Sequence, residues 1–104
     1  MRILFDQGTP APLRQSLPSH EVKTAFEMGW AELENGDLLA KADGNFDLLI
    51  TTDRNLRHQQ NLANFKLAIL VLPTTSWPEV REHTGEISTT VDAIQPRDYR
   101  EIKW

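Results

Sequence analysis

The chain has 104 residues, 39% hydrophobic and 25% charged, and this length and balance predict one soluble globular domain rather than two. It contains no cysteine, which excludes disulfides, thiolate metal sites and cysteine nucleophiles. The formal net charge of -4 argues against nucleic-acid binding through bulk electrostatics, so any contact with a polyanion must be local or mediated by a metal ion.

Neither a signal peptide nor a membrane span is expected. The acidic residue Asp6 follows too soon after Met1 for a secretory leader. No apolar stretch approaches the roughly 20 residues that cross a bilayer, and the longest, Leu67 to Leu72, suits a buried strand. We therefore expect a cytoplasmic protein with no membrane partner.

The first third of the chain predicts two strands and two helical segments. A buried strand is expected over residues 2–5, and a second, short strand over residues 20–24. Between them, Thr9 as N-cap and Pro10 at the first helical position form a recognised helix start. Residues 25–30 predict a helical turn.

The middle of the chain predicts a repeated alternation of helix and strand. Asn35-Gly36-Asp37 opens a helix that ends near residue 43, and a strand follows over residues 46–52. Residues 53–62 predict a polar helix, and residues 67–72 form the clearest strand of the sequence.

The last third predicts one long helix and an edge strand. Ser76 and Glu79 have the spacing of a capping box, in front of a helix over residues 77–94 that Gly85 weakens. A final strand is expected over residues 99–104. Strands that alternate with helices predict a single three-layer α/β/α sandwich with a central, mostly parallel five-stranded sheet.

Two aspartates each follow a short apolar run, Asp6 after residues 3–5 and Asp53 after residues 47–52. Such runs suit strands buried on both faces of a parallel sheet, which carries its working groups just beyond the carboxyl ends of its strands. Neighbouring carboxylates repel each other, so the pair predicts a bound Mg²⁺ or Mn²⁺ ion. The alternative is that each aspartate only turns the chain or caps a helix.

A metal site of this kind calls for a third carboxylate, and Glu34-Asn35-Gly36-Asp37 supplies two candidates. Asp37 is the better one because it falls in the first turn of a predicted helix that leads into the third strand. Helix capping is the alternative role for Asp37.

The segment after Asp53 is the one electropositive part of the sequence, because no Asp or Glu occurs from residue 54 to residue 78. Cationic side chains beside a helix start suit phosphate. The candidate substrate-binding residues are Thr52, Arg54, Asn55, Arg57 and His58. The alternatives are a solvated helix face and, for Thr52, an ordinary β-branched strand residue.

The ordered set of these motifs resembles the PIN-like domains, specifically the short bacterial PIN-like proteins of unknown function related to VapC-type toxin ribonucleases. The motifs are Arg2 to Asp6 followed by Pro10, the helix start at residues 36–39, the stretch from Leu49 to Leu56, and the strand at residues 68–72. The resemblance implies an α/β/α sandwich that cleaves RNA with Mg²⁺ or Mn²⁺.

Carried over by position, the resemblance implies that Asp6, Asp37 and Asp53 are both the catalytic residues and the metal ligands. Many relatives have a further acid shortly after the last of these, where this chain has Asn55. The resemblance also implies a small antitoxin protein as a partner, and a homodimer.

Three functions follow from the sequence. The leading hypothesis is a divalent-metal-dependent ribonuclease, the toxin of a toxin–antitoxin pair. The second is a catalytically inactive PIN-like module that binds RNA or a protein, which Asn55 and the acidic charge balance favour. The third is a receiver-like phosphoacceptor at Asp53, with Thr74 or Thr75 and Lys103 as its other residues; against it, Gln7 follows Asp6 where such domains pair two acids.

Overall fold

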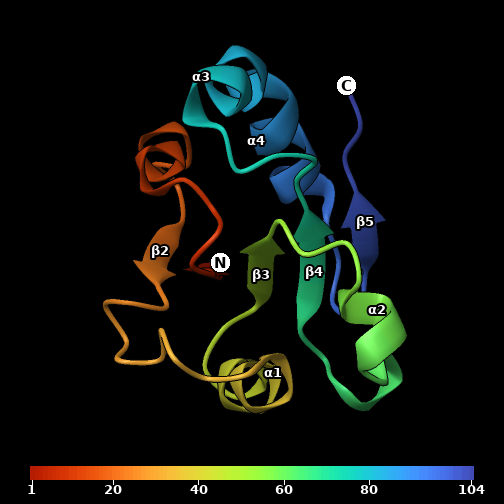
Figure 1. Cartoon of the computed structure of the whole chain (residues 1–104). Helices are drawn as coiled ribbons and strands as arrows, with labels where there is room; N and C mark the ends of the chain where they lie inside the picture. Colours follow the sequence, from red (N-terminus) through yellow and green to blue (C-terminus); the bar gives the residue numbers. More distant parts are fainter.

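The computed structural model describes residues 1–104 as a five-stranded sheet between two layers of helices (Figure 1). The strands are β1 (Arg2–Phe5), β2 (Glu21–Thr24), β3 (Leu48–Thr51), β4 (Ala68–Val71) and β5 (Tyr99–Glu101), in the order β2-β1-β3-β4-β5. Every neighbouring pair is parallel. The predicted α/β sandwich is therefore confirmed, and its sheet is wholly parallel.

Helices cover both faces of the sheet, which explains why its central strands are continuous apolar runs. On one face lie the 3₁₀ helix η1 (Ala11–Ser16) and the α-helices α3 (Trp77–Val80) and α4 (Thr84–Ala93); on the other lie α1 (Asn35–Asp43) and α2 (Leu56–Gln59). Successive strand residues serve opposite faces: Ile3 and Phe5 join the first core cluster and Leu4 joins the second. All four residues of β3 and of β4 are buried.

A crevice beside Asp6 and Asp53 requires that the chain change its direction of progress across the sheet between β1 and β3, and this change is present. The chain first adds β2 on one side of β1 and then adds β3, β4 and β5 on the other side. Phe5, the last residue of β1, is in register with Ile50, so β3 ends one residue beyond β1. A ligand crevice in an open α/β sheet lies at this kind of switch point, beyond the carboxyl ends of the strands. This side of the sheet is called the carboxyl edge below.

Two of the predicted helices in the first two thirds are shorter than expected. No α-helix begins at Thr9; η1 begins after Pro10, and the Thr9 hydroxyl instead lies 2.8 Å from the Ile50 carbonyl oxygen. The polar helix predicted over residues 53–62 is reduced to α2, followed by a 3₁₀ turn at Leu62–Asn64. Local side-chain bonds compete with helix here, because Asn61 accepts a hydrogen bond from the Ala63 N–H.

The long helix predicted over residues 77–94 is divided into α3, a 3₁₀ turn at Arg81–His83 and α4. The break lies at His83, whose φ of -125° is not helical, rather than at Gly85. The predicted capping box is wrong, since the Ser76 side chain caps no backbone N–H. The longest helix, α4, has 10 residues, and no helix is long and apolar enough to cross a bilayer.

Candidate functional site

The side chain of Thr51 connects the two aspartates of the switch point. Thr51 is the last residue of β3 and is 1% exposed. Its hydroxyl donates a hydrogen bond to Oδ2 of Asp6, directly after β1, and accepts one of 3.1 Å from the backbone N–H of Asp53. One buried hydroxyl therefore holds the segments that follow two adjacent strands against each other.

The carboxylate of Asp6 is half-buried and surrounded by donors. Its Oδ1 accepts from the Gly8 N–H at 3.1 Å and from the Thr9 hydroxyl at 2.9 Å. Burial raises the pKa of Asp6 above its ordinary value, although the hydrogen bonds from Thr51, Thr9 and Gly8 oppose this rise. The ionised carboxylate is thus held in place but incompletely compensated, and a nearby positive charge would stabilise it.

Asp53 is fixed by one backbone and one side-chain donor. Its Oδ1 accepts a 2.9 Å hydrogen bond from the Asn55 N–H, which closes a tight turn before α2. Its Oδ2 accepts a 2.9 Å hydrogen bond from Nδ2 of Asn35, the first residue of α1. The same Nδ2 lies 3.4 Å from Oε1 of Gln59. The residue that joins the start of α1 to the carboxyl edge is therefore Asn35.

Asp37, the third predicted carboxylate, lies in the first turn of α1 but is exposed and accepts no hydrogen bond. It lines none of the cavities of the molecule. No three Asp, Glu, His or Cys side chains in the structure form a group that could hold a metal ion. The structure thus links Asp6 and Asp53 through Thr51 and does not bring Asp37 to them.

Two cavities adjoin Asp6. A small one, of about 120 Å³, lies between Asp6 and the start of α1. Asn35, the hydrogen-bond partner of Asp53, lines this cavity, but Asp53 itself does not. A larger one, of about 450 Å³, extends from Asp6 to the turn after β2. Phe26 lines that cavity with a side chain that is 78% exposed. Asp6 therefore lines a cavity on each of two sides.

Thr52 lies beside the loop that follows β1. A Cβ atom added to Gly8 would overlap the Thr52 hydroxyl, so the two segments approach closely here and a larger residue would displace that hydroxyl. Thr52 thus belongs to the crevice between β1 and β3 rather than to the cationic surface formed by the residues that follow it.

Both aspartates keep acceptor positions that could bind a cation, although Asp53, like Asp37, lines none of the four cavities. A carboxylate offers about four acceptor positions, and those of Asp6 and Asp53 accept three and two hydrogen bonds respectively. Lone pairs therefore remain on both groups. Mg²⁺ commonly binds through one or two carboxylates together with water and substrate phosphate, so two aspartates without a third acid agree with this kind of site.

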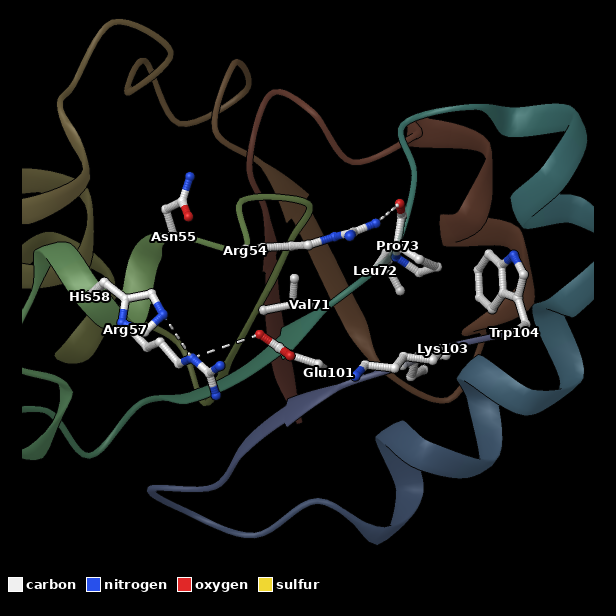
Figure 2. Close-up of a pocket in the computed structure, with 11 residues that line it drawn as sticks. Arg54, Asn55, Arg57, His58, Val71, Leu72, Pro73, Glu101, Lys103 and Trp104 are labelled. Atoms are coloured by element: carbon white, nitrogen blue, oxygen red, sulfur yellow. Dashed lines mark hydrogen bonds and ion pairs between the residues drawn. The ribbon is translucent and has the colours of Figure 1, made fainter.

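The other predicted substrate-binding residues lie together in a separate cavity of about 420 Å³ at the β4–β5 side of the carboxyl edge (Figure 2). It is called the basic cavity below. Its polar and aromatic lining comprises Arg54, Asn55, Arg57, His58, Glu101, Lys103 and Trp104. The structure thus brings four of the five predicted substrate-binding residues to one place.

Comparison of the chain with protein-family models, with curated proteins and with solved structures found no match.

Several residues of the carboxyl edge carry no clear signal in the sequence. Asn35 lies within the acidic stretch but is not acidic, and its contact with Asp53 depends on where α1 packs. Thr9 predicts a helix N-cap and instead binds Asp6. Phe26 lies among turn residues and outside any periodic apolar pattern. Its position outside such a pattern is the only sequence feature that indicates an exposed side chain.

Proposed function

We propose that the protein is a divalent-metal-dependent ribonuclease whose metal ion is held by Asp6 and Asp53. The observation that carries this proposal is the hydroxyl of Thr51, which binds both the carboxylate of Asp6 and the backbone N–H of Asp53 at the switch point of a parallel sheet. The resemblance to PIN-like toxin ribonucleases and the cationic residues after Asp53 support RNA as the substrate. The same resemblance suggests Asp37 as a third ligand and a small antitoxin as a partner.

The residues of the chain have separable roles in this proposal. A bound Mg²⁺ or Mn²⁺ ion would supply Lewis-acid polarisation of a phosphodiester and lower the pKa of a water molecule. Asp6 and Asp53 would bind the ion, and Thr51 and Asn35 would orient them through the hydrogen bonds described above. The raised pKa of Asp6 predicts that ion binding weakens at acidic pH, where this carboxyl is protonated.

The test is cleavage of a single-stranded RNA by the purified protein with Mg²⁺, with Mn²⁺ and with a chelator. We expect metal-dependent cleavage that falls by roughly 100-fold or more in Asp6→Asn and Asp53→Asn. Asp47→Asn is the matched control, because Asp47 precedes the opposite end of β3, where it pairs with Arg2. Absence of cleavage with every divalent metal, or an equal loss in the control, would reject the proposal.

A catalytically inactive module is the second candidate, and the missing third acid favours it. In such a module Asp6 and Asp53 would only join the segments after β1 and β3. RNA would then bind equally well to the wild type and to Asp6→Asn, with no cleavage in either and no change in the melting temperature when Mn²⁺ is added.

The receiver-like alternative gains support from the strand order, because receiver domains share the order 2-1-3-4-5. Lys103, however, lines the basic cavity beside Glu101, and Asp53 does not line that cavity. Incubation with acetyl phosphate and Mg²⁺, followed by intact-mass measurement, tests this candidate: a phosphoryl adduct that is absent from Asp53→Asn would favour it over the ribonuclease.

A further inference from the structure

The basic cavity concentrates positive charge in a protein of net negative charge. Three basic side chains, those of Arg54, Arg57 and Lys103, line it together with a single acid, Glu101. The formal net charge of the whole chain is -4. Like charges gathered in a concave site repel one another, and an anion relieves that repulsion.

Glu101 pairs with one of the three cations and feels the charge of the other two. Arg57 Nε lies 4.0 Å from Glu101 Oε1, and Figure 2 shows this pair beside Lys103. The pKa of Glu101 is lowered first by the hydrogen bond from the Tyr99 hydroxyl and then by the charges of Arg57, Lys103 and Arg54. One carboxylate cannot neutralise three cations, so the cavity keeps an excess of positive charge.

Two of the cations are held in place by the protein and the third has no partner. Nη2 of Arg54 donates a 2.7 Å hydrogen bond to the carbonyl oxygen of Pro73, which leaves its other N–H groups unused. The guanidinium of Arg57 lies 5.7 Å from the centre of the Tyr99 ring. Lys103 makes no hydrogen bond and no ion pair. Preorganised guanidinium groups with free donors are suited to phosphate oxygens.

An aromatic wall completes the cavity. The indole of Trp104 stacks on His83 with ring centroids 4.1 Å apart and an angle of 6° between the planes, and its Nε1 donates to Glu79 at 3.3 Å. The ring is therefore held by His83 of the 3₁₀ turn and by Glu79 of α3 while it lines the cavity. A volume of about 420 Å³ is within the range that holds a small ligand.

We propose that the basic cavity binds a phosphate group of a nucleotide, with the phosphate on Arg54, Arg57 and Lys103 and the base against Trp104. The identity of the natural ligand as RNA rests on the proposed function, whereas the affinity for a nucleotide phosphate does not. In a ribonuclease, the cavity would hold a nucleotide on the β5 side of the bond that is cut, because Arg54 directly follows Asp53.

The test measures binding without catalysis. A fluorescein-labelled single-stranded oligoribonucleotide is titrated with the protein in the presence of a chelator, and its anisotropy is followed. Adenosine 5′-monophosphate, adenosine and inorganic phosphate serve as competitors. The variants are Lys103→Gln and Arg57→Gln, with Lys41→Gln as the matched control, because Lys41 is an exposed, unpaired lysine near the end of α1.

We expect Lys103→Gln and Arg57→Gln to weaken binding on the order of 10-fold, and Lys41→Gln to leave it unchanged. Each lost contact should reduce the slope of log K against log salt concentration by about 0.7. The monophosphate should compete better than inorganic phosphate, and adenosine should compete least. Equal effects of all three variants, or equal competition by adenosine and its monophosphate, would overturn the proposal.

The two proposals can fail separately in this design. Nucleotide binding that depends on Lys103, without cleavage by any metal-loaded sample, would retain the phosphate site and reject the ribonuclease. Metal-dependent cleavage by a protein whose RNA affinity is unaffected by Lys103→Gln and Arg57→Gln would retain the ribonuclease and reject the phosphate site.

Discussion

The hydroxyl of Thr51 donates a hydrogen bond to the carboxylate of Asp6, across the β1–β3 pair at which the sheet reverses its order. Thr51 is almost completely buried, so this contact lies at the border between the hydrophobic core and the crevice. One oxygen of Asp6 is therefore held by a strand residue, and the other by Gly8 and Thr9 of the loop after β1. A rigid strand holds a functional group more accurately than a loop does.

Replacement of Thr51 by valine tests this contact, because valine keeps the shape of threonine and removes its hydroxyl. Asp6 loses a donor and the Asp53 N–H loses an acceptor. We expect Thr51→Val to lower the free energy of unfolding by about 2 kcal/mol, measured by urea denaturation. Thr51→Ser keeps the hydroxyl and removes one methyl group, which costs about 1 kcal/mol. A serine variant less stable than the valine variant would contradict the structural role of the hydroxyl.

The raised pKa of Asp6 predicts that its ionisation weakens the fold as the pH rises. A carboxyl whose folded-state pKa exceeds its unfolded value of 3.8 binds more protons in the folded state, so stability falls as the pH rises through the folded-state pKa. Asp6→Asn has no such ionisation, although its NH₂ group replaces one of the two oxygens that accept hydrogen bonds. We therefore expect the stability of Asp6→Asn relative to the wild type to improve from about pH 4 to neutral pH. Urea denaturation across this range measures the difference, and a difference that does not change with pH would contradict the prediction.

The strands are predictable from the sequence because they are short apolar runs buried on both faces, as at Leu48–Thr51 and Ala68–Val71. The helices are less predictable because they are short, and contacts of single side chains decide where each one begins and ends. Thr9 has the chemistry of an N-cap, but the neighbouring carboxylate of Asp6 provides a tertiary partner for its hydroxyl. His83 ends a helix that Gly85 was expected to weaken, and its stacking on Trp104 involves a residue far along the chain.

The candidate site follows from the sequence as far as strand ends determine it. Asp6 directly follows β1, and Asp53 comes one residue later after β3, so the register of the sheet brings their segments together. Asp37 lies on α1, and where a helix places its first turn depends on packing that no short motif encodes. The result is that Asn35, two residues earlier, makes the contact with Asp53. The contribution of Glu101 to the basic cavity likewise depends on the pairing of β5 with β4.

Substitution of Asn35 by aspartate should supply the third carboxylate that the site lacks. The new carboxylate would lie against that of Asp53, so repulsion should lower the melting temperature in the presence of a chelator. Added Mn²⁺ should then raise the melting temperature more than it does in the wild type, with an affinity gain of about 10-fold.

Asn45→Asp is the matched control for this substitution, because Asn45 follows α1 and its amide contacts Lys41 rather than an aspartate. Differential scanning fluorimetry over a Mn²⁺ titration gives the comparison. If Asn35→Asp and Asn45→Asp gain equally from Mn²⁺, the site between Asp6 and Asp53 does not bind the metal.

Tyr99 reports on the electrostatics of the basic cavity, and it is the only tyrosine in the chain. Burial and the hydrogen bond to Glu101 raise the pKa of Tyr99 from 10.0 to about 12. Because the raised value favours the neutral phenol in the folded state, its contribution to stability is present below pH 10.0 and is lost toward about pH 12. In Glu101→Gln the negative charge is absent, so the tyrosinate should form at lower pH. The ultraviolet absorbance of tyrosinate measures this shift, with circular dichroism at each pH to confirm that the fold persists.

The same Glu101→Gln variant should bind the labelled oligoribonucleotide more tightly, because the one acid that opposes Arg54, Arg57 and Lys103 has been neutralised. We expect a gain of about 3-fold to 10-fold at low salt that declines as salt is added. Glu86→Gln is the control, since Glu86 lies on α4 beside His83 and lines no part of the cavity. If Glu101→Gln lowers the pKa of Tyr99 but does not bind the oligoribonucleotide more tightly, the cavity contains no anion site that Glu101 occupies. The cations would then serve only to hold Glu101.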